Sequence, residues 1–293
     1  MLLRPVHGTE EDAEAVRQLA EASFAELHTE EGGAALAVPG SERSAQRREK
    51  ILHLVRTDPG GSWLAADAAG RPVGAAQSLI REGTWGLALL VVLPEAQGKG
   101  IGTALVEQTL QYGKACLRGM IGSTRHPMAA RTYRRAGFEL HPAMQLHGTV
   151  DAARLAGPDG PAVIGSPAHR DLMDSVDRRL RGGAHGVDHE YLLRHCRLFV
   201  ADDLAGSGYC YLGDDGRVEL LAATSRRLAT RLLTAALLSL PDGAQAQIRF
   251  LTAEQQWALD VGLAAGLELT TAGYLCLRGM RPPSPYIPSG GFL

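Results

Sequence analysis

Three glycines, at positions 98, 100 and 102, have a spacing that suits the binding of a phosphate group. They follow an apolar stretch that ends at Pro94, and the apolar spacing after them predicts a helix that begins near Gly100. The first amides of a helix have no partner within it, and the helix dipole favours an anion there. Because glycine has no Cβ, phosphate oxygens can approach the main chain closely. The segment therefore predicts a pyrophosphate-binding loop between a buried strand and a helix.

Glycine spacing alone does not identify the compound that such a loop binds. A mononucleotide P-loop requires G-x-x-x-x-G-K followed by Ser or Thr, and the sequence contains no such string. The dinucleotide fingerprint is G-x-G-x-x-G, whereas residues 98–102 read G-x-G-x-G, with Ala104 and Leu105 where the third glycine is expected. The residues that flank the loop must therefore decide.

The flanking residues resemble motif A of the GNAT superfamily of N-acetyltransferases. The shared pattern is V-x-P-x-x-Q-G-K-G-I-G-x-x-L, which is matched by Val92, Pro94, Gln97, Gly98, Gly100, Gly102 and Leu105. A second pattern further along, A-x-x-x-Y-x-x-x-G-F from Ala129 to Phe138, resembles motif B of the same family. Two motifs in the family's order make residues 1–150 similar to a GNAT domain.

The resemblance implies acetyl-CoA, or another acyl-CoA, as the co-substrate, and no metal ion. Main-chain groups at about 91–93 would pair with the pantetheine amides, and amides from 97 to 103 would hold the pyrophosphate. The implied cofactor-binding residues are Val91, Val92, Leu93, Gln97, Gly98, Lys99, Gly100, Ile101, Gly102, Thr103 and His126. Tyr133 of motif B would act as the general acid that protonates the departing thiolate; the alternative is an aromatic side chain that only packs on the sheet.

Two departures from the family pattern leave parts of the mechanism open. Position 126 holds His where the family usually has Asn, so His126 either contacts the coenzyme or only begins the helix before Pro127. Many members carry Glu or Asp as a general base on the strand before the loop, and residues 84–90 contain neither. Glu82 is a weak candidate for the base, and a water, His126 or a group from the second half are the alternatives.

A sheet and its helices must position these residues, and hydrophobic periodicity predicts their order. In the first half we expect strands at 2–6, 63–66, 72–80, 86–93, 118–121 and 138–150 and helices at 9–24, 44–55, 102–112 and 127–136. A segment rich in Ala, Gly, Pro and Asp follows, after which the order begins again. In the second half we expect helices at 168–180, 225–240 and 254–264 and strands at 197–201, 207–212, 218–222, 248–251 and 267–277.

An ungapped match between residues 129–140 and 258–269 supports a tandem repeat, although a helix that ends in Ala-Gly is common by itself. The second half lacks glycines at the loop position near Thr224, and Gly262 stands where the first half has Tyr133. We therefore regard the second half as degenerate.

The predicted fold class is α+β (α/β), with two GNAT-like mixed-sheet domains in tandem, each a central twisted sheet flanked by helices. The predicted domains are a catalytic, acyl-CoA-binding GNAT domain at 1–150, a linker at 151–161, and a degenerate GNAT-like domain with a Pro-rich tail at 162–293.

Composition argues against several other classes of protein. A formal charge of -2 leaves no basic excess for nucleic acid, and 45% apolar with 21% charged residues suits a packed core. The four cysteines form no C-x-x-C pair, no signal peptide opens the chain, and the apolar run 87–94 is too short to cross a membrane. We expect a cytoplasmic monomer or homodimer without a nucleic-acid or membrane partner.

Two other chemistries receive little support from the sequence. Four titratable residues lie close together in a stretch of loop-like composition but lack a recognised metal-binding frame, so no metal site is predicted; they are His185, Asp188, His189 and His195. A serine hydrolase would require G-x-S-x-G, which is absent from the sequence.

The predicted function is N-acetyl transfer from acetyl-CoA to a primary amine, on a small molecule or a peptide, by direct attack with Tyr133 as general acid. The alternative is a non-catalytic acyl-CoA-binding or sensor protein, which the missing carboxylate base favours and Tyr133 disfavours. The tail 282–293 is rich in Pro but ends in apolar residues, so it either frays or docks between the halves with its end near the acceptor.

Overall fold

The computed structural model describes residues 1–30 and 40–293. Its helices are α1 Glu10–Glu30, α2 Gly40–Thr57, α3 Ile101–Tyr112, α4 Pro127–Arg135, α5 Arg170–Arg181, α6 Asp188–His195, α7 Arg226–Leu238 and α8 Gln256–Ala264. Its strands are β1 Leu2–Pro5, β2 Ser62–Ala66, β3 Pro72–Arg81, β4 Thr84–Val92, β5 Arg118–Ser123, β6 Glu139–Thr149, β7 Val163–Ile164, β8 Cys196–Asp203, β9 Gly206–Gly213, β10 Val218–Ala223, β11 Gln245–Leu251, β12 Glu268–Arg278 and β13 Tyr286–Ile287. Among these helices, none is both long and apolar enough to span a membrane.

Two mixed or antiparallel sheets carry the strands and confirm the predicted fold class. One has eight strands in the order β1-β2-β3-β4-β5-β12-β6-β11, and the other has five in the order β13-β10-β9-β8-β7. Within the larger sheet, β4 and β5 are parallel, and the other paired neighbours are antiparallel.

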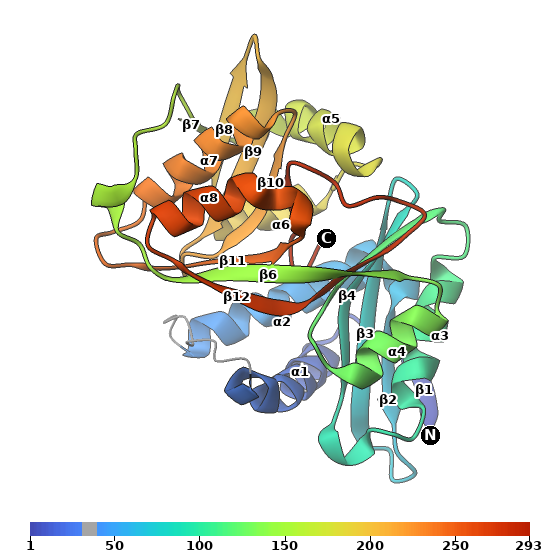
Figure 1. The fold of residues 1–293 in the computed structure, drawn as a ribbon. Helices are drawn as coiled ribbons and strands as arrows, with labels where there is room; N and C mark the ends of the chain where they lie inside the picture. The colour runs from blue at the N-terminus through green and yellow to red at the C-terminus, as the bar shows by residue number, and fades with distance from the viewer. Residues whose placement is uncertain (31–39) are drawn as a thin grey trace.

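The two halves of the chain exchange their long C-terminal strands. Strand β12 pairs with β5 of the first half, from Tyr274↔Ser123 to Arg278↔Gly119, and β6 pairs with β11 of the second half. Strands β6 and β12 also pair with each other and cross at the centre of the molecule (Figure 1). The predicted division at about residue 150 follows the order of elements along the chain and stays a prediction, because the exchange joins both halves in one sheet.

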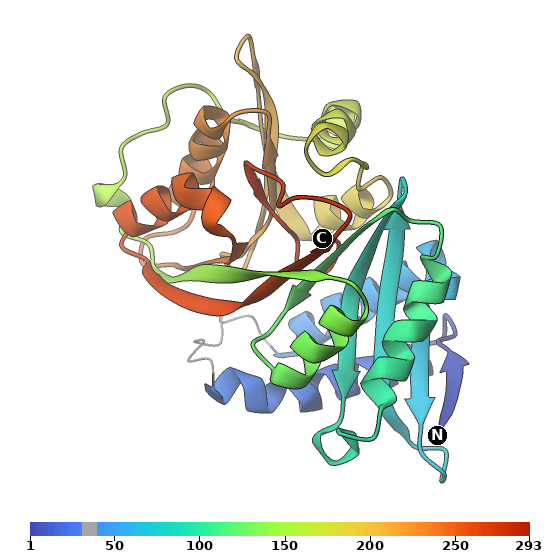
Figure 2. The ribbon, with the colours of Figure 1, turned by 45° about the vertical axis from the view of Figure 1, so that its right-hand side comes forward.

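Alternate residues of β2 and β3 pack against different helices, as the period of two in a strand requires. Leu64 and Ala75 lie in one cluster with residues of α1 and α2, whereas their neighbours Ala65 and Ala76 lie in another with residues of α3. Helices α1 and α2 therefore cover one face of this part of the sheet, and α3 covers the other (Figure 2).

Helix α6 is absent from the sequence prediction, which treated the stretch around it as loop. Its Tyr191 and Leu192 are buried between the halves of the molecule, in a cluster that also contains Leu54 of α2. At eight residues, five of them His, Asp, Glu or Arg within its first and last turns, α6 is too short to show a clear apolar period.

The C-terminal tail is packed, so docking between the halves is confirmed and fraying is wrong. Four apolar side chains of the tail are almost fully buried: Tyr286, Ile287, Phe292 and Leu293. Phe292 and Leu293 lie in the same cluster as Leu79 of the first half and Met173 of the second. The carbonyl oxygen of Leu293 lies 3.0 Å from Nε2 of buried His185, and Leu293 is not among the residues that line the cavity described below.

Candidate functional site

Strands β4 and β5 separate along their length and leave an open wedge in the sheet. They are paired only from Thr84↔Arg118 to Leu87↔Ile121, whereas β4 stays paired with β3 as far as Val92. A register shift opposite Gln77 and Ser78 leaves Ala88 without a partner on β3, a bulge at the point where the strands separate. On the β5 side, main-chain groups from Ala88 to Val92 can therefore bind an extended ligand.

The glycine loop lies at the end of this wedge and begins α3. Gly98 and Gly100 have φ of +74° and +81°, a left-handed conformation that residues with a Cβ adopt at a cost. A Cβ built at either of them would meet no atom within 4 Å, so the loop borders open space. The first α3 amide with an intrahelical partner is that of Ala104, which bonds the Gly100 carbonyl at 3.0 Å. The earlier amides can therefore bind an anion, and the residues present fit a pyrophosphate.

A cavity of about 1220 Å³ connects the wedge and the loop. It exceeds the roughly 300–1,000 Å³ typical of small-molecule sites, so it can hold a coenzyme and an acceptor together. The predicted residues that line it are Val91, Val92, Gln97, Gly98, Gly100, Ile101, Gly102, Thr103, His126 and Tyr133. Leu93 and Lys99 do not line it, and the Lys99 ammonium instead donates to the Glu95 carbonyl at 2.9 Å.

Tyr133 combines the two interpretations that the sequence left open. Its side chain is 5% exposed and lies in a cluster with Trp85, Phe138 and Cys276. It also borders the cavity, so one part of the ring packs on the sheet while the residue stays in reach of a ligand. Burial, with a smaller contribution from Cys276, raises the pKa of the Tyr133 hydroxyl above its ordinary value. The hydroxyl is therefore protonated at neutral pH and available as a proton donor.

Glu82 lies away from the cavity and has another role. Its carboxylate accepts hydrogen bonds from the Arg178 guanidinium, the shortest at 2.6 Å, and from the Ala184 amide at 3.0 Å. The ion pair between Glu82 and Arg178 holds the turn between β3 and β4 against the second half. His126 does line the cavity, as do carboxylates of the second half at Asp214, Asp215 and Glu219.

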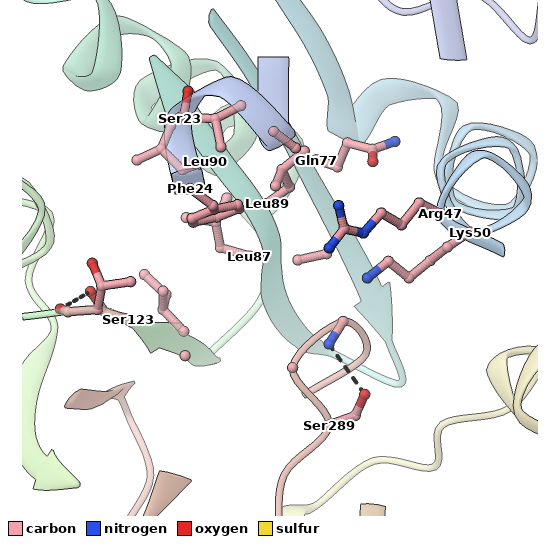
Figure 3. Close-up of a pocket in the computed structure, with 18 of the residues that line it drawn as sticks. Ser23, Phe24, Arg47, Lys50, Gln77, Leu87, Leu89, Leu90, Ser123 and Ser289 are labelled. Atoms are coloured by element: carbon pink, nitrogen blue, oxygen red, sulfur yellow. Dashed lines mark hydrogen bonds between the residues drawn. The ribbon is translucent and has the colours of Figure 1, made fainter. Parts of the chain in front are cut away.

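The far wall of the cavity comes from residues that the sequence analysis did not single out. Phe24 of α1 and Arg47 and Lys50 of α2 extend toward Leu87 and Leu89 of β4 (Figure 3). The tail loop at Ser289 closes another side (Figure 3). Nothing in the helical pattern of α1 and α2 marks these residues, because cavity-facing side chains there follow the same spacing as solvent-facing ones.

In the second half, the chain's own tail occupies the position that corresponds to the wedge. Strand β10 precedes helix α7 as β4 precedes α3, and Arg217, the residue before β10, forms a parallel bridge with Gln247 of β11. The tail strand β13 pairs with β10 at Leu221↔Ile287 and Ala222↔Tyr286. The start of α7 is also capped internally, because the Ser225 hydroxyl accepts from the Leu228 amide at 3.4 Å.

The histidines of residues 185–195 do not form one site. His185 and His189 meet Asp177 of α5, with ligand-type atoms of the three residues within 4.8 Å of one another. Asp188 instead pairs with Arg81, and His195 lies 2.9 Å from Glu49. The Asp177 carboxylate already accepts from His185 at 2.7 Å and from the Tyr209 hydroxyl, whereas the buried Nε2 of His189 has no hydrogen-bond partner among the described residues.

Comparison with known proteins finds a family model that matches part of the chain. Residues 58–140, which include the wedge, the glycine loop and Tyr133, match the model of the acetyltransferase (GNAT) domain. No curated protein sequence matches the chain.

Solved structures share the fold over the full chain. A protein described as an acetyltransferase, from Pyrococcus horikoshii, has 17% identity and a TM-score of 0.74 over 99% of this chain and 95% of its own. A GCN5-related N-acetyltransferase from Sphaerobacter thermophilus has 15% identity and a TM-score of 0.59, covering 99% and 98%. A tandem GNAT protein from the clavulanic acid biosynthesis pathway has 15% identity and a TM-score of 0.59, covering 96% and 99%.

Proposed function

We propose that this chain, which belongs to the GNAT acetyltransferase superfamily, transfers an acetyl group from acetyl-CoA to a primary amine at the cavity beside β4. The observation that carries the proposal is that the β4–β5 wedge, the glycine loop and Tyr133 all border one cavity. In the second half, β13 pairs with β10 at Leu221 and Ala222, so the tail fills the position that corresponds to the wedge. We therefore assign the chain one working site.

Bound acetyl-CoA would supply a thioester carbonyl for attack by the amine. The loop amides from Gly98 to Thr103 would hold its pyrophosphate, and main-chain groups of β4 at Val91 and Val92 would pair with pantetheine. A main-chain amide near Val92 would stabilise negative charge on the carbonyl oxygen. As the carbon–nitrogen bond forms and the carbon–sulfur bond breaks, the Tyr133 hydroxyl would donate its proton to the departing sulfur. The proton that the amine nitrogen loses would pass to solvent, from which the Tyr133 hydroxyl is restored.

Replacing Tyr133 by Phe tests this role. Such proton transfer contributes about 10²–10⁴ in rate, so we expect kcat to fall by about that factor while the Kd for acetyl-CoA stays nearly constant. Thiol release from acetyl-CoA with an amine acceptor gives kcat, and equilibrium titration gives Kd. Unchanged turnover would remove Tyr133 from the mechanism.

A non-catalytic acyl-CoA-binding protein is the second candidate, and one observation favours it. The strand before the loop carries no carboxylate, and Glu82 is held by Arg178 and outside the cavity. The two candidates differ in turnover: an enzyme releases thiol in the presence of an amine, whereas a binding protein does not.

The two halves of the chain have different roles in this proposal. We assign acyl-CoA binding to residues 1–150 and part of the acceptor wall to residues 162–293, with 151–161 as the linker between them. The acceptor is a small-molecule or peptide amine, and the protein is a cytoplasmic monomer or homodimer. Size-exclusion chromatography with light scattering would determine its oligomeric state.

A further inference from the structure

Lys50 is a cation of the cavity wall without an ion pair in the described part of the chain. Its side chain extends from α2 into the cavity and is only partly exposed (Figure 3). Within residues 1–24 and 40–293, its ammonium group has no hydrogen-bond or salt-bridge partner. The tail lies close to it, because a Cβ built at Gly291 would be 3.0 Å from Nζ. A partly desolvated ammonium group therefore faces the space where an acceptor would enter.

Nearby carboxylates are shared among several cations. Glu21 pairs with Arg17 of α1 and, at 3.4 Å, with Arg47 of α2. Glu219 of β10 lies 3.5 Å from Arg217, and its charge favours the charged form of Lys50. The carboxylates that line the cavity, Glu21, Glu42, Asp214, Asp215 and Glu219, therefore leave Lys50 without an ion pair among the described residues.

Burial and repulsion by neighbouring cations both lower the pKa values of Lys50 and Arg47. The pKa of Lys50 is lowered chiefly by burial; the charge of Glu219 opposes this shift, and the charges of Arg217 and Arg47 add to it. Burial likewise lowers the pKa of Arg47, and Arg43, Arg217 and Arg17 add to the effect. An anion bound here would relieve both costs.

We propose that the acceptor is a primary amine that also carries an anionic group, and that Lys50, with Arg47 beside it, binds that group. The proposal rests on the proposed acetyl transfer and names the chemical class of its acceptor. Carboxylate and phosphate share the required chemistry, since a lysine ammonium binds either as a point charge. Polyamines and other cationic acceptors would be repelled by Lys50 and Arg47.

The phosphates of the coenzyme are a poor match for Lys50. The glycine loop begins α3, which covers the face of the sheet opposite α1 and α2. Lys50 therefore approaches the cavity from the acceptor side of β4, while the loop amides approach from the other. We expect substitution at Lys50 to leave the KM for acetyl-CoA unchanged.

Matched pairs of amines test the proposal on the full-length protein. The pairs are amino acids against their amides, and phosphoethanolamine against ethanolamine, with putrescine as a cationic acceptor. Thiol release gives kcat/KM for each. One charge-assisted hydrogen bond corresponds to about a tenfold to hundredfold difference, so the wild type should prefer the anionic member of a pair by that factor. The carboxylate and phosphate pairs reveal which anion is preferred.

Substitutions assign the preference to Lys50. K50M keeps the length of the side chain without its charge and should abolish the preference, while K50R should retain part of it. K114M is the matched control, because Lys114 is exposed and does not line the cavity. Melting temperatures of all variants check the fold, and the wild-type comparison of acids with amides needs no variant.

The outcomes separate the acceptor proposal from the proposed function. Equal use of acids and amides by the wild type, or an undiminished preference in K50M, would overturn the anionic acceptor alone. A higher KM for acetyl-CoA in K50M would assign Lys50 to the coenzyme and would also overturn it. Turnover of no amine at all would contradict acetyl transfer itself.

Discussion

The glycine loop offers a sharp test, because a single methyl group should affect binding far more than folding. Gly100 has φ of +81°, where a residue with a Cβ costs about 1–2 kcal/mol. A Cβ there meets no atom within 4 Å, so no further steric cost is expected in the free protein. Gly100→Ala should therefore lower the melting temperature by about 2–4 °C for each kcal/mol lost.

Acetyl-CoA binding should respond more strongly to the same change. The new methyl group projects into the open space beside the first amides of α3, where the pyrophosphate is proposed to lie. Loss of one charge-assisted hydrogen bond would raise the Kd for acetyl-CoA by about tenfold to hundredfold. Circular dichroism measures melting, and equilibrium titration measures Kd.

Gly70→Ala is the matched control for this prediction. Gly70 has φ of +82°, and its Cβ would also meet no atom within 4 Å. It lies in the turn between β2 and β3 and does not line the cavity. The two variants should melt at similar temperatures while only Gly100→Ala binds weakly. Equal Kd values for the two would refute the assignment of the loop to the pyrophosphate.

Two further predictions concern the buried charges. Asp188 of the second half accepts from Arg81 of the first at 2.6 and 2.7 Å, both buried, so Asp188→Asn should cost about 3–5 kcal/mol of unfolding free energy in urea. Arg178→Gln, at the exposed pair between the halves, should change little, and equal losses would refute the argument from burial. Burial holds the pKa of His185 below 6.5 despite Asp177, so below about pH 6.5 the unfolded chain binds a proton that the folded chain does not. The urea midpoint should fall from pH 7 to pH 5, and less so in His185→Gln; an equal fall in both would contradict it.

Local features of the site could be predicted from the sequence because local interactions determine them. The left-handed glycines at 98 and 100 and the start of α3 depend on a few adjacent residues, and so does the left-handed glycine after α4 at Gly137. The repeat predicts the same conformation at Gly266, which has the same φ of +85°. Both glycines end a helix whose following strand is one of the exchanged pair.

Features that depend on contacts between the halves could not be predicted. Side chains along β6 and β12 alternate between the two faces of the sheet in the same way whichever strand lies beside them. The sequence therefore does not reveal that these two strands are exchanged between the halves. Pairing of β13 with β10 depends likewise on the fold of the whole chain. Lys50 lies on an ordinary amphipathic helix, and only the position of α2 against β4 brings it to the cavity.

The central claim, one acetyl-CoA site formed by the first half of the chain, is tested most directly by calorimetric titration of the wild-type protein with acetyl-CoA. We expect one site per chain, because β4 and β5 separate to form a wedge, whereas β13 is paired along β10 in the second half. Two equivalent sites per chain, or no binding, would contradict the account.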